Sequence, residues 1–147
     1  MLRELQTYIG KNYDAMNTAA AAMVVGMGVV KDYTKNEVKL PDAATDKGVF
    51  FVTKEKRAEG VYAGAGELSD YEEQFMNIKA GEFVKLVIPA KGERYATDQF
   101  TDGAAAGDYL NAGTDGKFAK STDATRFVYR GTKKVDRHEL HVIEVID

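Results

Sequence analysis

Cysteine is absent from this sequence of 147 residues. Its absence excludes disulfide frameworks, thiolate zinc sites and cysteine nucleophiles, and it fits synthesis in a reducing cytosol. Proline is nearly absent as well. Pro41 and Pro89 both fall at the ends of apparent strands, where a missing backbone N–H is tolerated best.

The sequence also has no excess of one charge and no long apolar run. Its net charge is -3, from 20 basic and 23 acidic residues, whereas a nucleic-acid binder concentrates lysine and arginine, so we expect no nucleic-acid partner. The longest stretch of low charge, residues 15–30, contains Asn17, Thr18 and two glycines. We therefore expect no membrane partner, and the opening MLRELQTYIGKNYD has no export-signal pattern.

Recognisable catalytic motifs are missing too. The two serines, Ser69 and Ser121, do not lie in a G-x-S-x-G turn, the closely spaced glycines lack the third glycine of a dinucleotide fingerprint, and no G-K-[ST] phosphate loop occurs. The acidic loop residues miss the calcium-loop spacing and are interpreted as turn formers; they are Asp98, Asp102, Asp108 and Asp115. We expect no catalytic residues, no cofactor and no enzymatic activity.

His138 and His141 are the one pair that resembles metal ligands. The alternating VIEVID that follows favours a strand, on which residues three apart point to opposite faces and do not chelate one ion. We therefore predict no metal site here.

The sequence predicts a mainly β fold, a small β-barrel or sandwich with an N-terminal arm and one short helix. With 44% hydrophobic residues, the chain is long enough for one core. From Met23 onward, short apolar runs with turn signals every eight to twelve residues are typical of such folds. The strands are expected at 23–33, 49–53, 61–63, 82–88, 94–97, 108–110, 117–120, 126–130 and 139–146.

Three hairpins are predicted. Lys91-Gly92 separates FVKLVIP from RYATD, Asp115-Gly116 separates DYLNAG from KFAK, and the charged segment 131–137 separates FVYR from LHVIEVI. Asp115-Gly116 is the strongest of these signals, because aspartate tolerates the left-handed region and glycine adopts it freely.

The predicted organisation has two parts: an arm or short amphipathic helix at 1–22, and a single β-rich domain at 23–147. Leu2, Leu5, Tyr8 and Ile9 recur at helical spacing before Gly10. Their apolar face is expected to pack either on its own domain or on a neighbouring subunit. A second helix is expected at 69–78, where Ser69 and Glu72 form a capping box.

Four segments in order carry a family resemblance: GMGVVKDYTKNEVKLPDAATDKGVFFVTKE, IKAGEFVKLVIPAKGERYATDQF, GDYLNAGTDGKFAK and the last strand LHVIEVID. In texture and order they resemble head decoration (cement) proteins, small virion structural proteins of tailed bacteriophages. The likeness covers most of residues 23–147.

The resemblance implies a capsid decoration protein made in the host cytoplasm and located in the virion, on the capsid surface. Its partner would be the major capsid protein, and itself if it forms a homo-oligomer such as a trimer. It would stabilise the expanded shell by binding it selectively. The candidate partner contacts are Leu2, Leu5, Tyr8, Ile9 and Tyr13.

Two alternatives remain open. One is a tail-tube, head-completion or adaptor protein of the virion. The other is a ligand-binding or enzymatic β-barrel that uses the acidic loops together with His138 and His141.

Overall fold

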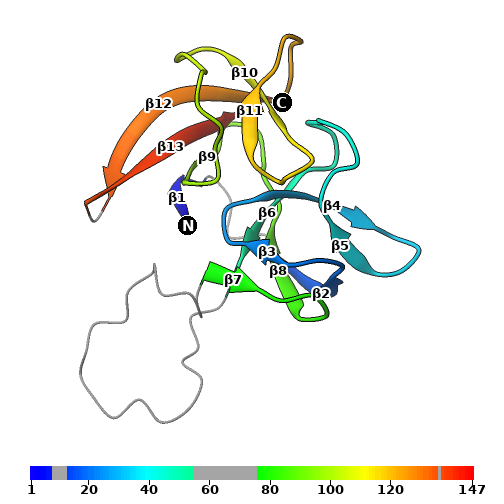
Figure 1. Ribbon diagram of the computed structural model, residues 1–147. Helices are drawn as coiled ribbons and strands as arrows, with labels where there is room; N and C mark the ends of the chain where they lie inside the picture. Colours follow the sequence, from blue (N-terminus) through cyan, green and yellow to red (C-terminus); the bar gives the residue numbers. More distant parts are fainter. Residues whose placement is uncertain (8–12, 55–75, 136) are drawn as a thin grey trace, which may run out of the picture.

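The computed structural model describes residues 1–7, 13–54, 76–135 and 137–147, and these are mostly β-strand, which confirms the predicted class (Figure 1). The strands are β1 (Leu2–Gln6), β2 (Tyr13–Ala19), β3 (Met23–Val24), β4 (Gly28–Asp32), β5 (Glu37–Lys39), β6 (Phe50–Thr53), β7 (Asn77–Ile78), β8 (Phe83–Val87), β9 (Arg94–Thr97), β10 (Tyr109–Ala112), β11 (Phe118–Lys120), β12 (Phe127–Val135) and β13 (His138–Val145).

These strands form a closed barrel and an open sheet. The barrel has the order β2-β5-β4-β6-β8, and the six-stranded sheet has the order β1-β9-β13-β12-β10-β11. Strands β3 and β7 make a separate two-stranded pair. In Figure 1 the six-stranded sheet lies above the barrel, and the chain crosses between them several times.

The barrel and the sheet share one wall. On β6, Phe51 belongs to a core with the sheet residues, whereas the next residue, Val52, belongs to the core inside the barrel. On β8, Val87 belongs to the core shared with the sheet, and Leu86 belongs to the core inside the barrel. Successive side chains point to opposite faces of a strand, so both faces of this wall are buried. That explains why FFVT and KLVI read as continuous apolar runs.

Close backbone approach joins the two parts at Gly28. A Cβ atom at this position would lie 2.8 Å from the Cβ of Ala112 and 2.9 Å from the ring of Phe118. The Gly28 N–H donates a hydrogen bond of 2.8 Å to the carbonyl of Gly116. Only glycine leaves room for this contact, which fixes β4 against the β10–β11 hairpin.

Two of the three predicted hairpins are confirmed. β10 and β11 pair around Asp115-Gly116, with Gly116 at a φ of 77°. β12 pairs with β13, and the connecting segment proves to be strand as far as Val135.

The third hairpin prediction is wrong in its pairing. Lys91 and Gly92 do form a turn, in which the Glu93 N–H donates to the Ala90 carbonyl at 3.1 Å. However, β8 pairs with β2 and β6, while β9 pairs with β1 and β13. The turn therefore carries the chain from the barrel to the sheet, a choice that the local sequence does not specify.

The helix expected within residues 1–22 is also corrected, because the described residues there form β1 and β2. Leu2 and Leu5 lie three apart and point to opposite faces of β1. Leu2 packs on the core shared with the barrel wall, and Leu5 packs on a small core of Met1, Ala96, Leu140 and Val142. Burial of both faces accounts for the spacing that looked helical. β1 joins the sheet and β2 the barrel, so the described part of 1–22 is no separate arm.

Other predictions fall partly or wholly outside the described residues. The strand at 61–63 and most of the capped helix at 69–78 lie there, and Asn77–Ile78 at its end is strand β7. The expected strand at 23–33 is divided into β3 and β4 at Gly26, whose φ is 97°. Strand β5 was not predicted.

Candidate interaction surface

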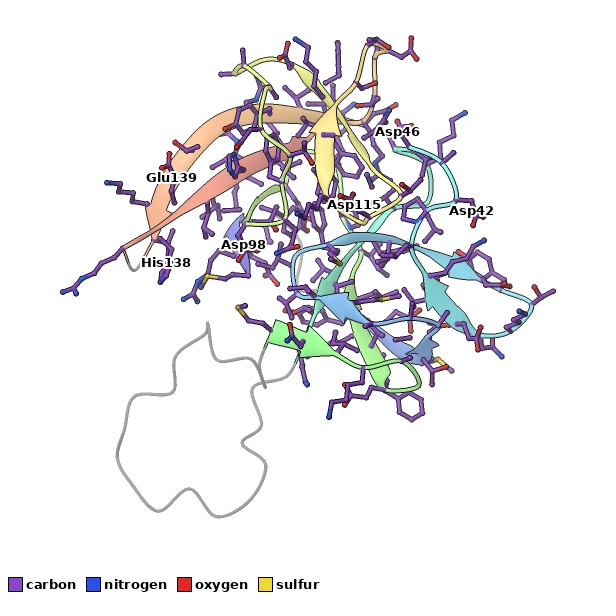
Figure 2. The ribbon with its side chains drawn as sticks, in the orientation of Figure 1. Asp42, Asp46, Asp98, Asp115, His138 and Glu139 are labelled. Atoms are coloured by element: carbon purple, nitrogen blue, oxygen red, sulfur yellow. The ribbon has the colours of Figure 1, made fainter. Side chains whose placement is uncertain are left out.

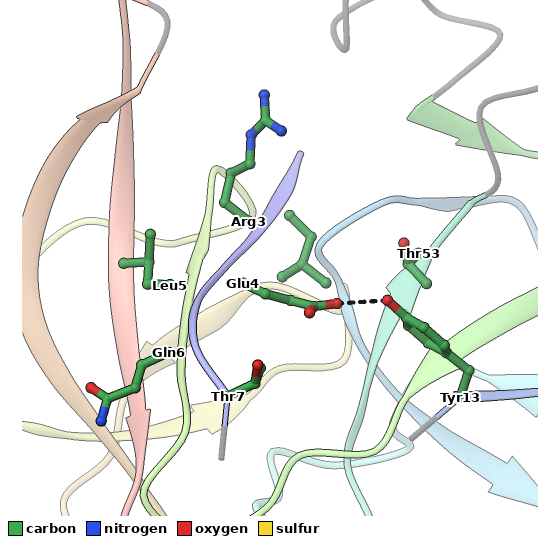
Figure 3. A pocket seen from close by; sticks show the side chains of 8 residues that line it. Arg3, Glu4, Leu5, Gln6, Thr7, Tyr13 and Thr53 are labelled. Atoms are coloured by element: carbon green, nitrogen blue, oxygen red, sulfur yellow. Dashed lines mark hydrogen bonds between the residues drawn. The ribbon is translucent and has the colours of Figure 1, made fainter. Parts of the chain in front are cut away.

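Three of the predicted contact residues line one open pocket of about 450 Å³. Leu2 and Leu5 approach it from β1, and Tyr13 approaches it from the start of β2 (Figure 3). All three are half-buried, and Leu2 and Tyr13 pack on the core shared by sheet and barrel. Tyr8 and Ile9 lie outside the described residues. The side chains that the sequence singled out are thus gathered here, but they also support their own domain.

Among the described strands, β1 is the last one on its side of the six-stranded sheet, and it forms one wall of the pocket. One edge of β1 pairs with β9, and the other edge faces the barrel, where Tyr13 and Thr53 form the opposite wall. The Tyr13 hydroxyl donates a hydrogen bond of 2.8 Å to Glu4 Oε1 across this space.

Two large apolar side chains stand out on the adjoining barrel wall. Met16 on β2 is 83% exposed and Phe83 on β8 is 74% exposed. Their strands pair with Thr18 opposite Phe83 and Asn17 opposite Val84. Because side chains alternate, Met16, Thr18 and Phe83 share the outer face while Asn17 and Val84 point inward. Exposure of this degree for two neighbouring apolar side chains is typical of contact surfaces.

The two features are continuous. A second hollow, of about 300 Å³, is lined by Ala15, Lys54, Phe83, Val84 and Lys85. Lys54 follows Thr53 of the first pocket directly. In addition, the Lys85 ammonium lies 4.2 Å from the centre of the Tyr13 ring. We call the combined area, from β1 to Met16 and Phe83, the arm-barrel face.

The lysines of the arm-barrel face are held by their neighbours. Lys54 donates to the carbonyl of Asn77 at 2.9 Å and lies 3.8 Å from Glu82. Lys85 rests on the Tyr13 ring, which favours a cation electrostatically. The face is therefore apolar at Met16 and Phe83 and basic between them and the pocket.

Sequence reasoning missed Met16 and Phe83, although one signal for Phe83 was present. In FVKLV, strict alternation places Phe83 with Lys85 on one side and Val84 with Leu86 on the other, which predicts an aromatic side chain on a polar face. Met16 had no such signal, because the register of β2 against β8 shifts between Asp14 and Asn17.

The histidine pair does not form a joint site. His138 is exposed at the tip of β13, near Glu139 (Figure 2). His141 lies on the other face, as predicted, where its ring stacks on Phe100 with 4.2 Å between centres. Its Nδ1 lies 3.0 Å from the Tyr129 hydroxyl, whose pKa is raised by burial.

The acidic loop residues mostly serve local structure. Asp115 accepts the N–H of Lys117 at 3.0 Å within its own turn, and Asp108 accepts the N–H of Ala105 at 2.7 Å. This backbone hydrogen bond is the main cause of the lowered pKa of Asp108. Asp98 instead pairs with the α-amino group of Met1, whose pKa is lowered by burial. Their turn-forming role is confirmed for Asp108 and Asp115.

Across the described ranges, no three histidine, aspartate or glutamate side chains gather as metal ligands would. No helix in the described part of the chain has the length and apolar character needed to cross a membrane. No family model matches the sequence, and no curated protein matches it.

Proposed function

We propose that this protein is a head decoration protein of a tailed bacteriophage, which binds the outer capsid lattice through the arm-barrel face and stabilises the expanded shell. The partner is the major capsid protein. The observation that carries the proposal is the exposure of Met16 and Phe83 on the barrel wall. The order of the four sequence segments resembles that of cement proteins, and this resemblance is the reason for proposing a capsid protein as the partner.

The physical mechanism is selective binding. A protein that binds the expanded shell and not its precursor shifts the equilibrium toward the expanded state by mass action. A stable contact buries on the order of 1,000 Å² or more, centred on a few well-packed apolar side chains. Met16 and Phe83 supply such anchors.

Deletion of the first residues is not a clean test of this proposal. Residues 2–6 pair with β9, and Tyr13 begins a barrel strand. Removing residues 1–14 would therefore strip an edge strand from the sheet and open the barrel, so lost binding would only report lost folding.

Point substitutions on the exposed wall separate binding from folding. The double variant Met16→Ser with Phe83→Ser removes apolar surface that the folded monomer leaves in water. It should keep the wild-type unfolding midpoint and lose at least tenfold in affinity for empty expanded heads of the encoding phage, measured by co-sedimentation. The matched control is Tyr109→Ser, at a half-exposed aromatic on β10 of the six-stranded sheet. It should bind as the wild type does.

Saturable binding of the wild type to expanded heads, absent with unexpanded heads, is the expected result. Binding to tails and not to heads would contradict the head assignment. Unchanged affinity in the double variant would overturn the role of the arm-barrel face.

A further inference from the structure

Three polar side chains lie inside one end of the barrel: Asp14 and Asn17 from β2, and Lys31 from β4. Lys31 is directly opposite Val38, and Asn17 is opposite Val84. Both valines are fully buried in the barrel core, and opposed residues of paired strands share a face. Asn17 is accordingly only 8% exposed and the Lys31 side chain only 11%.

The carboxylate of Asp14 holds the other two groups together. Its Oδ2 accepts a hydrogen bond from the Lys31 ammonium and a second one, of 3.2 Å, from the Asn17 carboxamide. Its Oδ1 accepts the N–H of Met16 at 2.9 Å, which fixes the orientation of the carboxylate. The Phe50 ring covers the amine, with Nζ at 4.5 Å from the ring centre. An amine and a carboxamide thus meet on one oxygen atom under an aromatic cover.

This arrangement contains more than an ion pair requires. Lys31 and Asp14 alone would satisfy each other's charge, whereas Asn17 adds a carboxamide carbon, which an amine is able to attack. We propose that Lys31 and Asn17 form an internal amide cross-link, with Asp14 as the acid–base group. The inference is independent of the proposed capsid function.

The reaction balances without any co-reactant. Asp14 takes a proton from the Lys31 ammonium, and the resulting neutral amine attacks Cγ of Asn17. A bond from Nζ to Cγ forms, the bond from Cγ to Nδ2 breaks, and Asp14 returns its proton to the departing nitrogen. The leaving ammonia takes the second proton of the attacking nitrogen and departs as ammonium. One ammonium side chain and one carboxamide give one secondary amide and one ammonium ion, with no change of oxidation state.

Two physical effects favour this step. Proton transfer from Lys31 to Asp14 converts a partly buried ion pair, whose side chains are 11% and 20% exposed, into a neutral pair, which is penalised less than separate neutralisation of either group. The shared Asp14 oxygen also brings the amine and the carboxamide of one chain close together, which replaces a bimolecular encounter by an intramolecular reaction.

The cross-link would join strands that are not neighbours. In the barrel order, β5 separates β2 from β4 on one side, and β6 and β8 separate them on the other. A covalent bond through the interior would therefore fasten opposite parts of the wall.

Intact-mass spectrometry of the folded, then denatured, wild-type protein is the direct test. The expected mass is that of the sequence less one ammonia molecule. Trypsin should fail to cleave after Lys31, because its amine is acylated, and should release residues 12–35 as one peptide with the same deficit. Fragmentation of this peptide should yield no backbone ions from within the closed loop between Asn17 and Lys31.

Variants assign the roles. Lys31→Arg and Asp14→Ala should both restore the full sequence mass, with circular dichroism reporting whether each retains its strands. Lys85→Arg, at an outward-facing lysine of the same barrel, should keep the deficit. Full sequence mass in the wild type after prolonged incubation of the folded protein would overturn the proposal, whether or not the variants fold. A deficit of one water molecule would also overturn it, because it would place the bond between Lys31 and Asp14.

Discussion

Replacement of Phe51 by alanine should be among the most destabilising single substitutions in this protein. Phe51 is fully buried on the wall that the barrel and sheet share. Its ring stacks on Tyr95 at 4.7 Å and on Phe118 at 5.1 Å, and it meets Phe127 edge-on at 6.0 Å.

The magnitude follows from burial and ring contacts. Phenylalanine-to-alanine substitutions in cores cost about 3–5 kcal/mol, from lost transfer free energy and the cavity left behind. Aromatic pairs contribute about 0.5–1.5 kcal/mol each beyond their buried area. With three such pairs, we expect the upper end of the range, about 5 kcal/mol. That is a large share of the ~5–15 kcal/mol by which domains are normally stable.

Urea unfolding of the variants Phe51→Ala and Phe83→Ala compares the loss of a buried phenylalanine with the loss of an exposed one. With a urea dependence of about 2 kcal/mol per molar, Phe51→Ala should lower the midpoint by roughly 2.5 M or leave the protein unfolded without denaturant. Phe83→Ala makes the same chemical change at a side chain that is 74% exposed, and should alter stability by less than about 0.5 kcal/mol. A loss below about 2 kcal/mol for Phe51→Ala, or equal losses for both, would refute the shared-wall account.

The other predictions concern backbone space and pH. Gly26→Ala should be far more destabilising in urea than Gly103→Ala, because both glycines have positive φ but only at Gly26 would Cβ lie 2.3 Å from Thr97 Oγ1; equal losses would contradict this. The pKa of Glu144 is lowered, chiefly by its hydrogen bond from Arg130. The contribution of the ionised Glu144 carboxylate to the free energy of unfolding is therefore complete above the ordinary pKa of 4.5, and it is lost as the pH falls below that value. The stability advantage of wild type over Glu144→Gln should accordingly shrink as the pH is lowered below 4.5, and an advantage that stays constant or grows with acidification would refute the argument.

Local patterns predicted the fold class and several strands because the signals are local. Asp115-Gly116 specifies its turn within two residues, and the alternation after His141 places the two histidines on opposite faces whatever the rest of the chain does. Leu2, Leu5 and Tyr13 line one pocket, which nothing in the sequence specified, and their role as partner contacts stays a prediction. The helix predicted at Leu2 and Leu5 was wrong because a strand that is buried on both faces imitates helical spacing.

The sequence by itself determined a cysteine-free, mainly β chain with its principal hairpins, because composition, alternation and turn residues act over a few positions. Only the tertiary structure decided which strands pair across long separations, so that the Lys91-Gly92 turn joins barrel to sheet. Barrel closure likewise decided that Asn17 and Lys31 meet on Asp14 inside, while Met16 and Phe83 are left outside. These choices depend on burying both faces of a shared wall, a property of the whole packed chain.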